Sequence, residues 1–118
     1  MKLSRMAEIL EAEVLCCHEN LDMDISVVEA SDMMSDVLAH TENDKALITG
    51  LCTVHAVLTA QILDLGAVVF VRAKVPTPEM IKTAKENGIA LLRTGYPMYV
   101  ACGMLYQNGL GGRQRIDG

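Results

Sequence analysis

Cys52 and His55 are the two side chains whose types and spacing best suit nucleophilic chemistry. At the start of a helix they would share a face, because residues three apart are neighbours on a helix surface. A thiolate at a helix N-terminus has a lowered pKa, and a nearby imidazole can take its proton. No third group is visible to orient the base, and two ligands are fewer than a metal site uses. We therefore predict no catalytic or metal-binding residue and expect Cys52 to be a small buried hydrophobic residue.

The remaining cysteines do not form a recognisable motif. Cys16 and Cys17 are adjacent and Cys102 is distant, so the chain has no C-x-x-C pair and no disulfide framework. Cys16-Cys17-His18 could suggest a metal, but alternation along a strand points the two thiols to opposite faces. We expect reduced thiols, a cytoplasmic location and no cofactor.

Polar residues that follow apolar strands form a second kind of candidate site. In open parallel sheets, ligands bind beyond the carboxyl ends of the strands, where helix N-termini collect free N–H groups. Arg72 and Lys74 follow the most apolar strand, so their charges are expected at that edge. The arrangement predicts a site for a small anion or a nucleotide; the alternative is a set of helix caps and solvated turns. The candidate residues are Ser31, Asp32, Thr49, Gly50, Thr53, Arg72, Lys74, Thr94 and Gly95.

Composition limits the possible classes of protein. The 118 residues are 51% hydrophobic and 21% charged, which indicates one folded domain. A net charge of −5 with ten scattered Lys and Arg excludes binding to a nucleic-acid backbone, and three Tyr, one Phe and no Trp argue against base stacking. No apolar run reaches the roughly 18 residues of a membrane span, and the charged N-terminal stretch is not a signal peptide.

Hydrophobic periodicity predicts an alternation of helices and short strands. Caps are expected at Ser4, Ser31, Thr53 and Thr77, and helix stops at Gly66, 87–88 and 108–109. The pattern favours one α/β domain of two or three layers over 1–110, with a mainly parallel sheet of about five strands, and a flexible tail over 111–118. The predicted helices span 4–12, 31–40, 53–65, 78–87 and 97–107, and the predicted strands span 13–17, 25–29, 46–49, 67–71 and 89–93.

Several segments carry a resemblance to a known family: SDMMSDVLAH, ALITG, AVVFVRAKVPTPEMIKTAKENGIALLRT and PMYVACGMLYQNGL. From Leu3 to about Leu110 the chain resembles the DRTGG-domain family, and in particular its small stand-alone members, which are named for similarity to HPr serine kinase/phosphorylase. The resemblance implies a non-catalytic regulatory or structural domain. Two turns depart from the family pattern: Val28-Glu29-Ala30 replaces Thr-Gly-Gly, and Gly50-Leu51-Cys52-Thr53 replaces Gly-Asp-Arg. The chain also lacks the G-x-x-x-x-G-K-[ST] loop of phosphoryl transfer.

These observations favour a regulatory or accessory domain that binds a small anionic metabolite or nucleotide, a protein partner, or both. An edge strand and an apolar last helix favour a homodimer. The first alternative is a structural subunit of a larger enzyme complex, for example a redox complex. The second alternative is a small enzyme that uses Cys52 and His55.

Overall fold

Helices and short strands alternate along the chain, as the apolar periodicity predicts. The computed structural model describes residues 1–41, 46–112 and 114. Their elements are α1 (Leu3–Ile9), β1 (Glu13–Cys16), the 3-10 helix η1 (His18–Asp22), β2 (Val28–Ala30), α2 (Met34–His40), β3 (Ala46–Thr49), α3 (Val54–Ile62), β4 (Ala67–Phe70), α4 (Pro78–Glu86), β5 (Ala90–Arg93) and α5 (Met98–Gln107).

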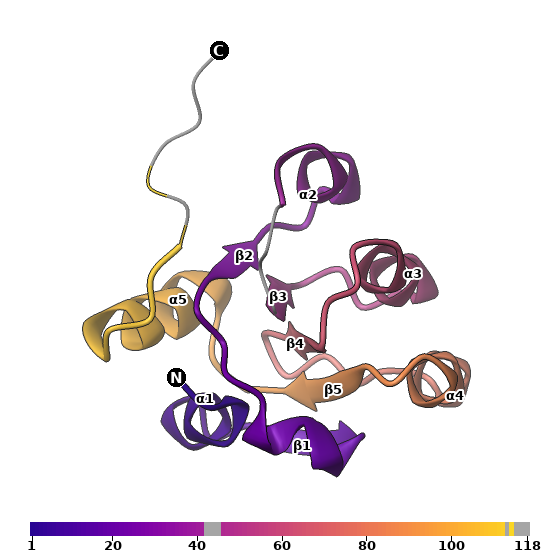
Figure 1. Cartoon of the computed structure of the whole chain (residues 1–118), viewed down its shortest axis with the longest axis horizontal. Helices are drawn as coiled ribbons and strands as arrows, with labels where there is room; N and C mark the ends of the chain where they lie inside the picture. The colour runs from indigo at the N-terminus through magenta and orange to yellow at the C-terminus, as the bar shows by residue number, and fades with distance from the viewer. Residues whose placement is uncertain (42–45, 113, 115–118) are drawn as a thin grey trace.

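The five strands form one mixed sheet in the order β1-β5-β4-β3-β2 (Figure 1). The strands β2, β3, β4 and β5 are parallel, and only β1 is antiparallel, against β5. The central strands β3 and β4 are buried along their whole length, as strands covered on both faces should be. The prediction of a mainly parallel sheet of about five strands is confirmed.

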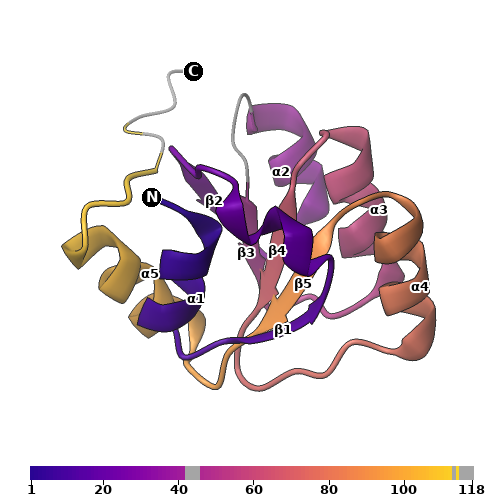
Figure 2. The same ribbon diagram turned by 60° about the horizontal axis from the view of Figure 1, so that its bottom comes forward.

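Helices cover both faces of the sheet, which makes the domain a three-layer sandwich (Figures 1 and 2). The connecting helices α2, α3 and α4 bury one apolar cluster around Phe70 and Leu91. The first and last helices, α1 and α5, bury the other cluster, which contains Met6 and Leu105. The alternation of buried side chains along each strand thus supplies both cores.

The helix ends with specific capping signals lie where the sequence predicts them. Thr77 Oγ1 accepts a hydrogen bond from the Met80 amide at 3.2 Å, and Pro78 is the first residue of α4. Gly88 and Gly109 follow α4 and α5 with φ of 66° and 94°, the left-handed conformation that glycine adopts without a steric penalty.

Other predicted boundaries are wrong. Neither Ser4 nor Thr53 makes a capping hydrogen bond: α1 starts at Leu3, and Thr53 precedes α3 without using its hydroxyl. Asp64, with φ of 56°, follows α3 in place of Gly66. The predicted loop at 18–24 contains η1, and the second strand begins at Val28 because the Ile25 amide bonds the Met1 carbonyl.

The chain beyond α5 returns to the free edge of the sheet. Gly111 forms a parallel bridge with Val27, and the Val28 amide donates to the Gly111 carbonyl at 3.3 Å. The flexible tail predicted over 111–118 remains a prediction, since 113 and 115–118 lie outside the described residues, as do 42–45 of the predicted turn.

Candidate functional site

The carboxyl ends of the four parallel strands lie along one edge of the sheet. The connections after β2, β3 and β4 lead to helices on one face, whereas the connection after β5 leads to α5 on the other face (Figure 1). Neighbouring parallel strands whose connections diverge in this way leave a crevice between them, and ligands of open α/β sheets bind in such crevices. The natural binding position of this sheet is therefore between the ends of β4 and β5.

The chain itself closes that crevice. After β4, Arg72 and Ala73 take left-handed backbone conformations with φ of 58° and 57°. Their amides donate to the carbonyls of Tyr96 and Thr94 at 2.9 and 2.8 Å. The Arg93 guanidinium then donates to the carbonyls of Ala73 and Lys74. These bonds join the two connections over the strand ends, so the accessible part of the edge lies over β2, β3 and β4.

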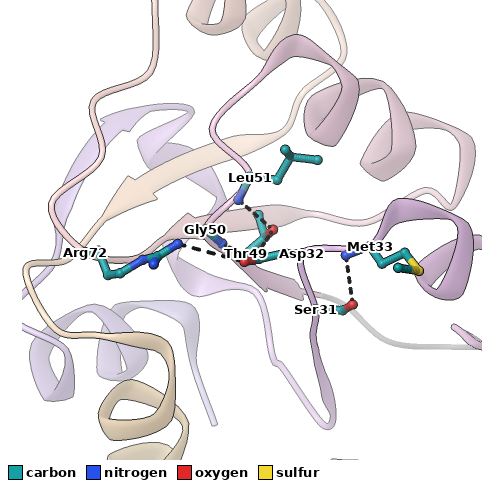
Figure 3. Close-up of polar contacts among 7 residues, drawn as sticks. All are labelled: Ser31, Asp32, Met33, Thr49, Gly50, Leu51 and Arg72. Carbon is teal, nitrogen blue, oxygen red and sulfur yellow. Dashed lines mark hydrogen bonds and ion pairs between the residues drawn. The ribbon is translucent and has the colours of Figure 1, made fainter.

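Asp32 joins the ends of those three strands (Figure 3). Its Oδ1 accepts a hydrogen bond from the Gly50 amide at 2.6 Å and another from the Thr49 hydroxyl at 3.2 Å. Its Oδ2 lies 3.9 Å from the Arg72 guanidinium, and both side chains are about half exposed, at 52% and 57%. A carboxylate and a guanidinium that are far apart in the sequence therefore lie side by side, open to solvent.

Gly50 allows these two groups to approach each other. A Cβ atom at this position would lie 2.7 Å from an Arg72 guanidinium nitrogen and 3.2 Å from Asp32 Oδ1. Any larger residue would displace the guanidinium or the carboxylate. Gly50 was predicted for the site because it follows an apolar strand. The structure gives the reason for a glycine there: the side chains of Asp32 and Arg72, from the ends of two other strands, leave no room for a larger residue.

The hydroxyls predicted for the site have partners inside the chain. Thr49 is fully buried, and its hydroxyl bonds both Asp32 and the Leu51 amide. Thr94 is 2% exposed and donates to the Leu10 carbonyl at 2.6 Å. Ser31 accepts from the Met33 amide. The structure places these residues at the carboxyl ends of the strands, and their hydroxyls hold the connections in place.

Among the other predicted residues, Thr53, Lys74 and Gly95 are exposed at this edge. The Lys74 ammonium makes no ion pair in the described part of the chain. Arg93 was not among the predicted site residues, although its guanidinium anchors the connection after β4. The sequence signal for Arg93 is a cation at the end of an apolar strand, the same signal that singled out Arg72.

Cys52 and His55 do not form a nucleophile and base. Cys52 precedes Thr53 and lies outside α3, so the shared helix face that the spacing suggests is absent. Burial raises the pKa of the Cys52 thiol, and the nearby cations Lys74 and Arg93 offset this only in part. Desolvation therefore outweighs activation at this thiol.

The other cysteines behave as packed thiols. All four are free; Cys16 is buried and donates weakly to the Ile89 carbonyl at 3.4 Å. Burial raises the pKa of Cys17 to about 11, and the neighbouring Cys16 adds to the effect. Within the described ranges, no three His, Cys, Asp or Glu side chains gather in a way that could hold a metal ion. The helices of the same residues are too short or too polar to cross a membrane.

The fold and the sequence identify the family. The DRTGG domain family matches residues 5–107, so the chain belongs to the DRTGG domain family. A comparison with curated protein sequences found no match.

A solved structure with the same fold is the regulatory region of Clostridium perfringens pyrophosphatase. That structure comprises CBS and DRTGG domains, complexed with the activator diadenosine tetraphosphate. The superposition has a TM-score of 0.75 at 18% sequence identity, and it covers 90% of this chain and 46% of that chain. The present chain thus spans just under half the length of the regulatory region.

Proposed function

We propose that this chain is a non-catalytic regulatory module that binds a small anionic ligand, with a nucleotide as the preferred candidate, at the ends of β2, β3 and β4. The observation that carries this proposal is the half-exposed Asp32 carboxylate beside the half-exposed Arg72 guanidinium. A surface pair of this kind contributes little to stability, about 0–1 kcal/mol. A pair held in place by two hydrogen bonds to Asp32 and by a strained loop at Arg72 is better explained as a recognition site.

The two charges suit the two ends of a nucleotide. A guanidinium binds phosphate oxygens through paired N–H donors, and the exposed Lys74 ammonium supplies a second positive charge nearby. A carboxylate at the end of a neighbouring strand can accept hydrogen bonds from ribose hydroxyls. The first-turn amides of α3 extend the site, because Thr53 leaves them without a side-chain acceptor.

Backbone strain at Arg72 and Ala73 supports the same conclusion. Each non-glycine residue in the left-handed region costs about 1–2 kcal/mol. Such strain persists where the surrounding structure enforces it, and it gathers at functional sites. Here it lies in the connection that closes the crevice at β4 and β5, and the Arg72 guanidinium of that connection lies 3.9 Å from Asp32.

Membership of the DRTGG domain family and the nucleotide activator of the clostridial pyrophosphatase region support a regulatory, nucleotide-binding role. The proposal also includes a cytoplasmic location, consistent with four free cysteines. It includes a protein partner, which can be a second copy of the chain. The nine residues predicted for the site are retained, with Asp32, Gly50, Thr53, Arg72 and Lys74 nearest the ligand.

The test is a binding screen with a matched control. Purified protein is titrated with diadenosine tetraphosphate, AMP, ATP and inorganic phosphate by calorimetry and thermal shift. A nucleotide is expected to raise the melting temperature of the wild type and of Arg5→Ala, and to have no effect on Arg72→Ala. Arg5 is the control because its side chain is 56% exposed and also pairs with a carboxylate, Glu8.

Two results would overturn the proposal. The first is the absence of binding by every compound to the wild type. The second is an Arg72→Ala variant that responds as strongly as the wild type.

A further inference from the structure

The outer face of α5 has no partner within the chain. Ala101 and Leu105 are buried against the sheet, while Tyr99 is 90% exposed and Tyr106 is 67% exposed. Tyr99, Val100, Gly103, Tyr106 and Gln107 are the exposed residues of the helix. At about 100° per residue they lie within an arc of roughly 120°, and Gly103 is at its centre. We call these five residues the α5 face.

Nothing inside the chain explains the glycine at the centre of this face. A Cβ atom at Gly103 would have no other atom within 4 Å, and the residue does not have a positive φ. A glycine in the middle of a helix costs about 1 kcal/mol relative to alanine. A glycine that neither packing nor backbone conformation requires is best explained by the close approach of something outside the chain.

The shape of the face favours a protein over a small molecule. A hollow of about 600 Å³ lies along α5, and all its lining residues belong to this one helix. Small-molecule sites are concave and enclose most of their ligand, whereas one helix forms only an open surface. Tyrosines beside an uncharged centre are typical of protein interfaces.

The charges of the chain limit where a second copy can bind. The chain carries a net charge of −5, so two copies repel each other over most orientations. The ten residues of α5, MYVACGMLYQ, include no Asp, Glu, Lys or Arg. The α5 face is therefore a surface on which two copies can meet without burying or opposing like charges.

The two tyrosines supply part of the area that a stable dimer buries. The exposed parts of Tyr99 and Tyr106 amount to roughly 300 Å², from about 200 Å² for a whole tyrosine side chain. A standard interface buries roughly 800 Å² on each partner. A second hollow extends the surface from Cys102 and Tyr106 to Val28 and Ala30 at the free edge of the sheet, so further area adjoins the α5 face.

We propose that the chain forms a two-fold symmetric homodimer in which the α5 faces pack antiparallel and cross at Gly103. In that register Tyr99 lies beside Gln107 of the second copy, and Val100 lies beside Tyr106 of the second copy. Every residue thus meets a suitable one: a phenol meets a carboxamide, an aliphatic side chain meets an aromatic ring, and a glycine meets a glycine. The proposal specifies the partner in the proposed function, and its test involves no ligand.

Size-exclusion chromatography with light scattering at several protein concentrations tests this proposal. The wild type is expected to be a dimer, and Gly103→Glu and Tyr106→Glu are expected to weaken association by about 30-fold or more, as at an interface hot spot. Gly103→Glu should fold, because its side chain enters open space. Circular dichroism checks the fold of each variant.

The matched control is Ile62→Glu, which places the same charge on another exposed hydrophobic residue, 70% exposed on α3. This variant should remain dimeric. A monomeric wild type at every concentration would overturn the proposal, and so would a dimer that survives Gly103→Glu or dissociates only in Ile62→Glu. Because ligand binding is measured separately, either proposal can fail alone.

Discussion

Replacing Asp32 by alanine removes the carboxylate that joins the ends of β2, β3 and β4. Two interactions of different kinds are lost. Oδ1 accepts hydrogen bonds from the Gly50 amide at 2.6 Å and from the Thr49 hydroxyl, whereas Oδ2 lies 3.9 Å from the Arg72 guanidinium. The hydrogen bonds hold the end of β3 against the connection after β2, and the ion pair reaches across to the connection after β4.

The hydrogen bonds should account for most of the change in stability. Hydrogen bonds to charged groups contribute about 1.5–3 kcal/mol, and water competes at a side chain that is 52% exposed, so we expect about 2 kcal/mol for Asp32→Ala. The long, exposed ion pair contributes about 0–1 kcal/mol, so Arg72→Ala should cost less than Asp32→Ala. Asp32→Asn keeps a neutral acceptor for the Gly50 amide, and we expect about 1 kcal/mol.

Urea denaturation followed by circular dichroism measures these differences in the free energy of unfolding. Thermal denaturation gives a second measurement: for a domain of this size, a loss of about 2 kcal/mol corresponds to a fall in melting temperature of roughly 8 °C. The expected order of stability is wild type, then Arg72→Ala, then Asp32→Asn, then Asp32→Ala. An Asp32→Ala variant that loses no more stability than Arg72→Ala would refute the reasoning, because the carboxylate would then not hold the strand ends together.

Two further predictions concern the buried hydroxyl of Thr94 and the thiols of the cysteines. Thr94→Val leaves the buried Leu10 carbonyl without its donor and should cost about 1–3 kcal/mol in urea denaturation, while the exposed Thr53→Val should cost almost nothing. Because raised pKa values lower the thiolate fraction, Cys52 should alkylate more slowly than a free thiol at neutral pH, and Cys17 roughly 100-fold more slowly. Peptide mapping by mass spectrometry would contradict this if Cys52 reacted as fast as a free cysteine added to the same reaction.

The parts of the fold that could be predicted from the sequence have local physical causes. The apolar runs of β3 and β4 are buried on both faces of the sheet, and these two strands begin and end within about a residue of prediction. Thr77-Pro78 and the glycines after α4 and α5 are capping signals that act within one helical turn. Alternation of helices and strands then favours parallel pairing.

The role of Asp32 could not be predicted, because its partner is distant in the sequence. Ser31 and Asp32 precede α2 and have the composition of a helix cap, but α2 begins at Met34 without a side-chain cap. The Asp32 carboxylate instead bonds the amide of Gly50, 18 residues away. A local rule considers only the hydrogen bonds between Asp32 and its own helix, whereas the observed bond depends on a strand end that the tertiary fold brings close.

The closed crevice could not be predicted for a similar reason. Left-handed conformations are expected at glycine, but here they fall on Arg72 and Ala73. The strain is offset by hydrogen bonds to the connection after β5, which becomes a neighbour only when the sheet has formed. Likewise, β1 and β2 are consecutive strands in the sequence, but they lie at opposite edges of the sheet, and β1 pairs with β5.

Amide chemical-shift mapping by NMR during a titration with diadenosine tetraphosphate tests the central claim most directly, because it locates a ligand and detects its binding in the same measurement. The largest shifts are predicted at Asp32, Gly50, Arg72 and Lys74, with no change at Gly103 on the opposite layer. Shifts confined to the α5 face, or no shifts at saturating nucleotide, would contradict a ligand site at the ends of β2, β3 and β4.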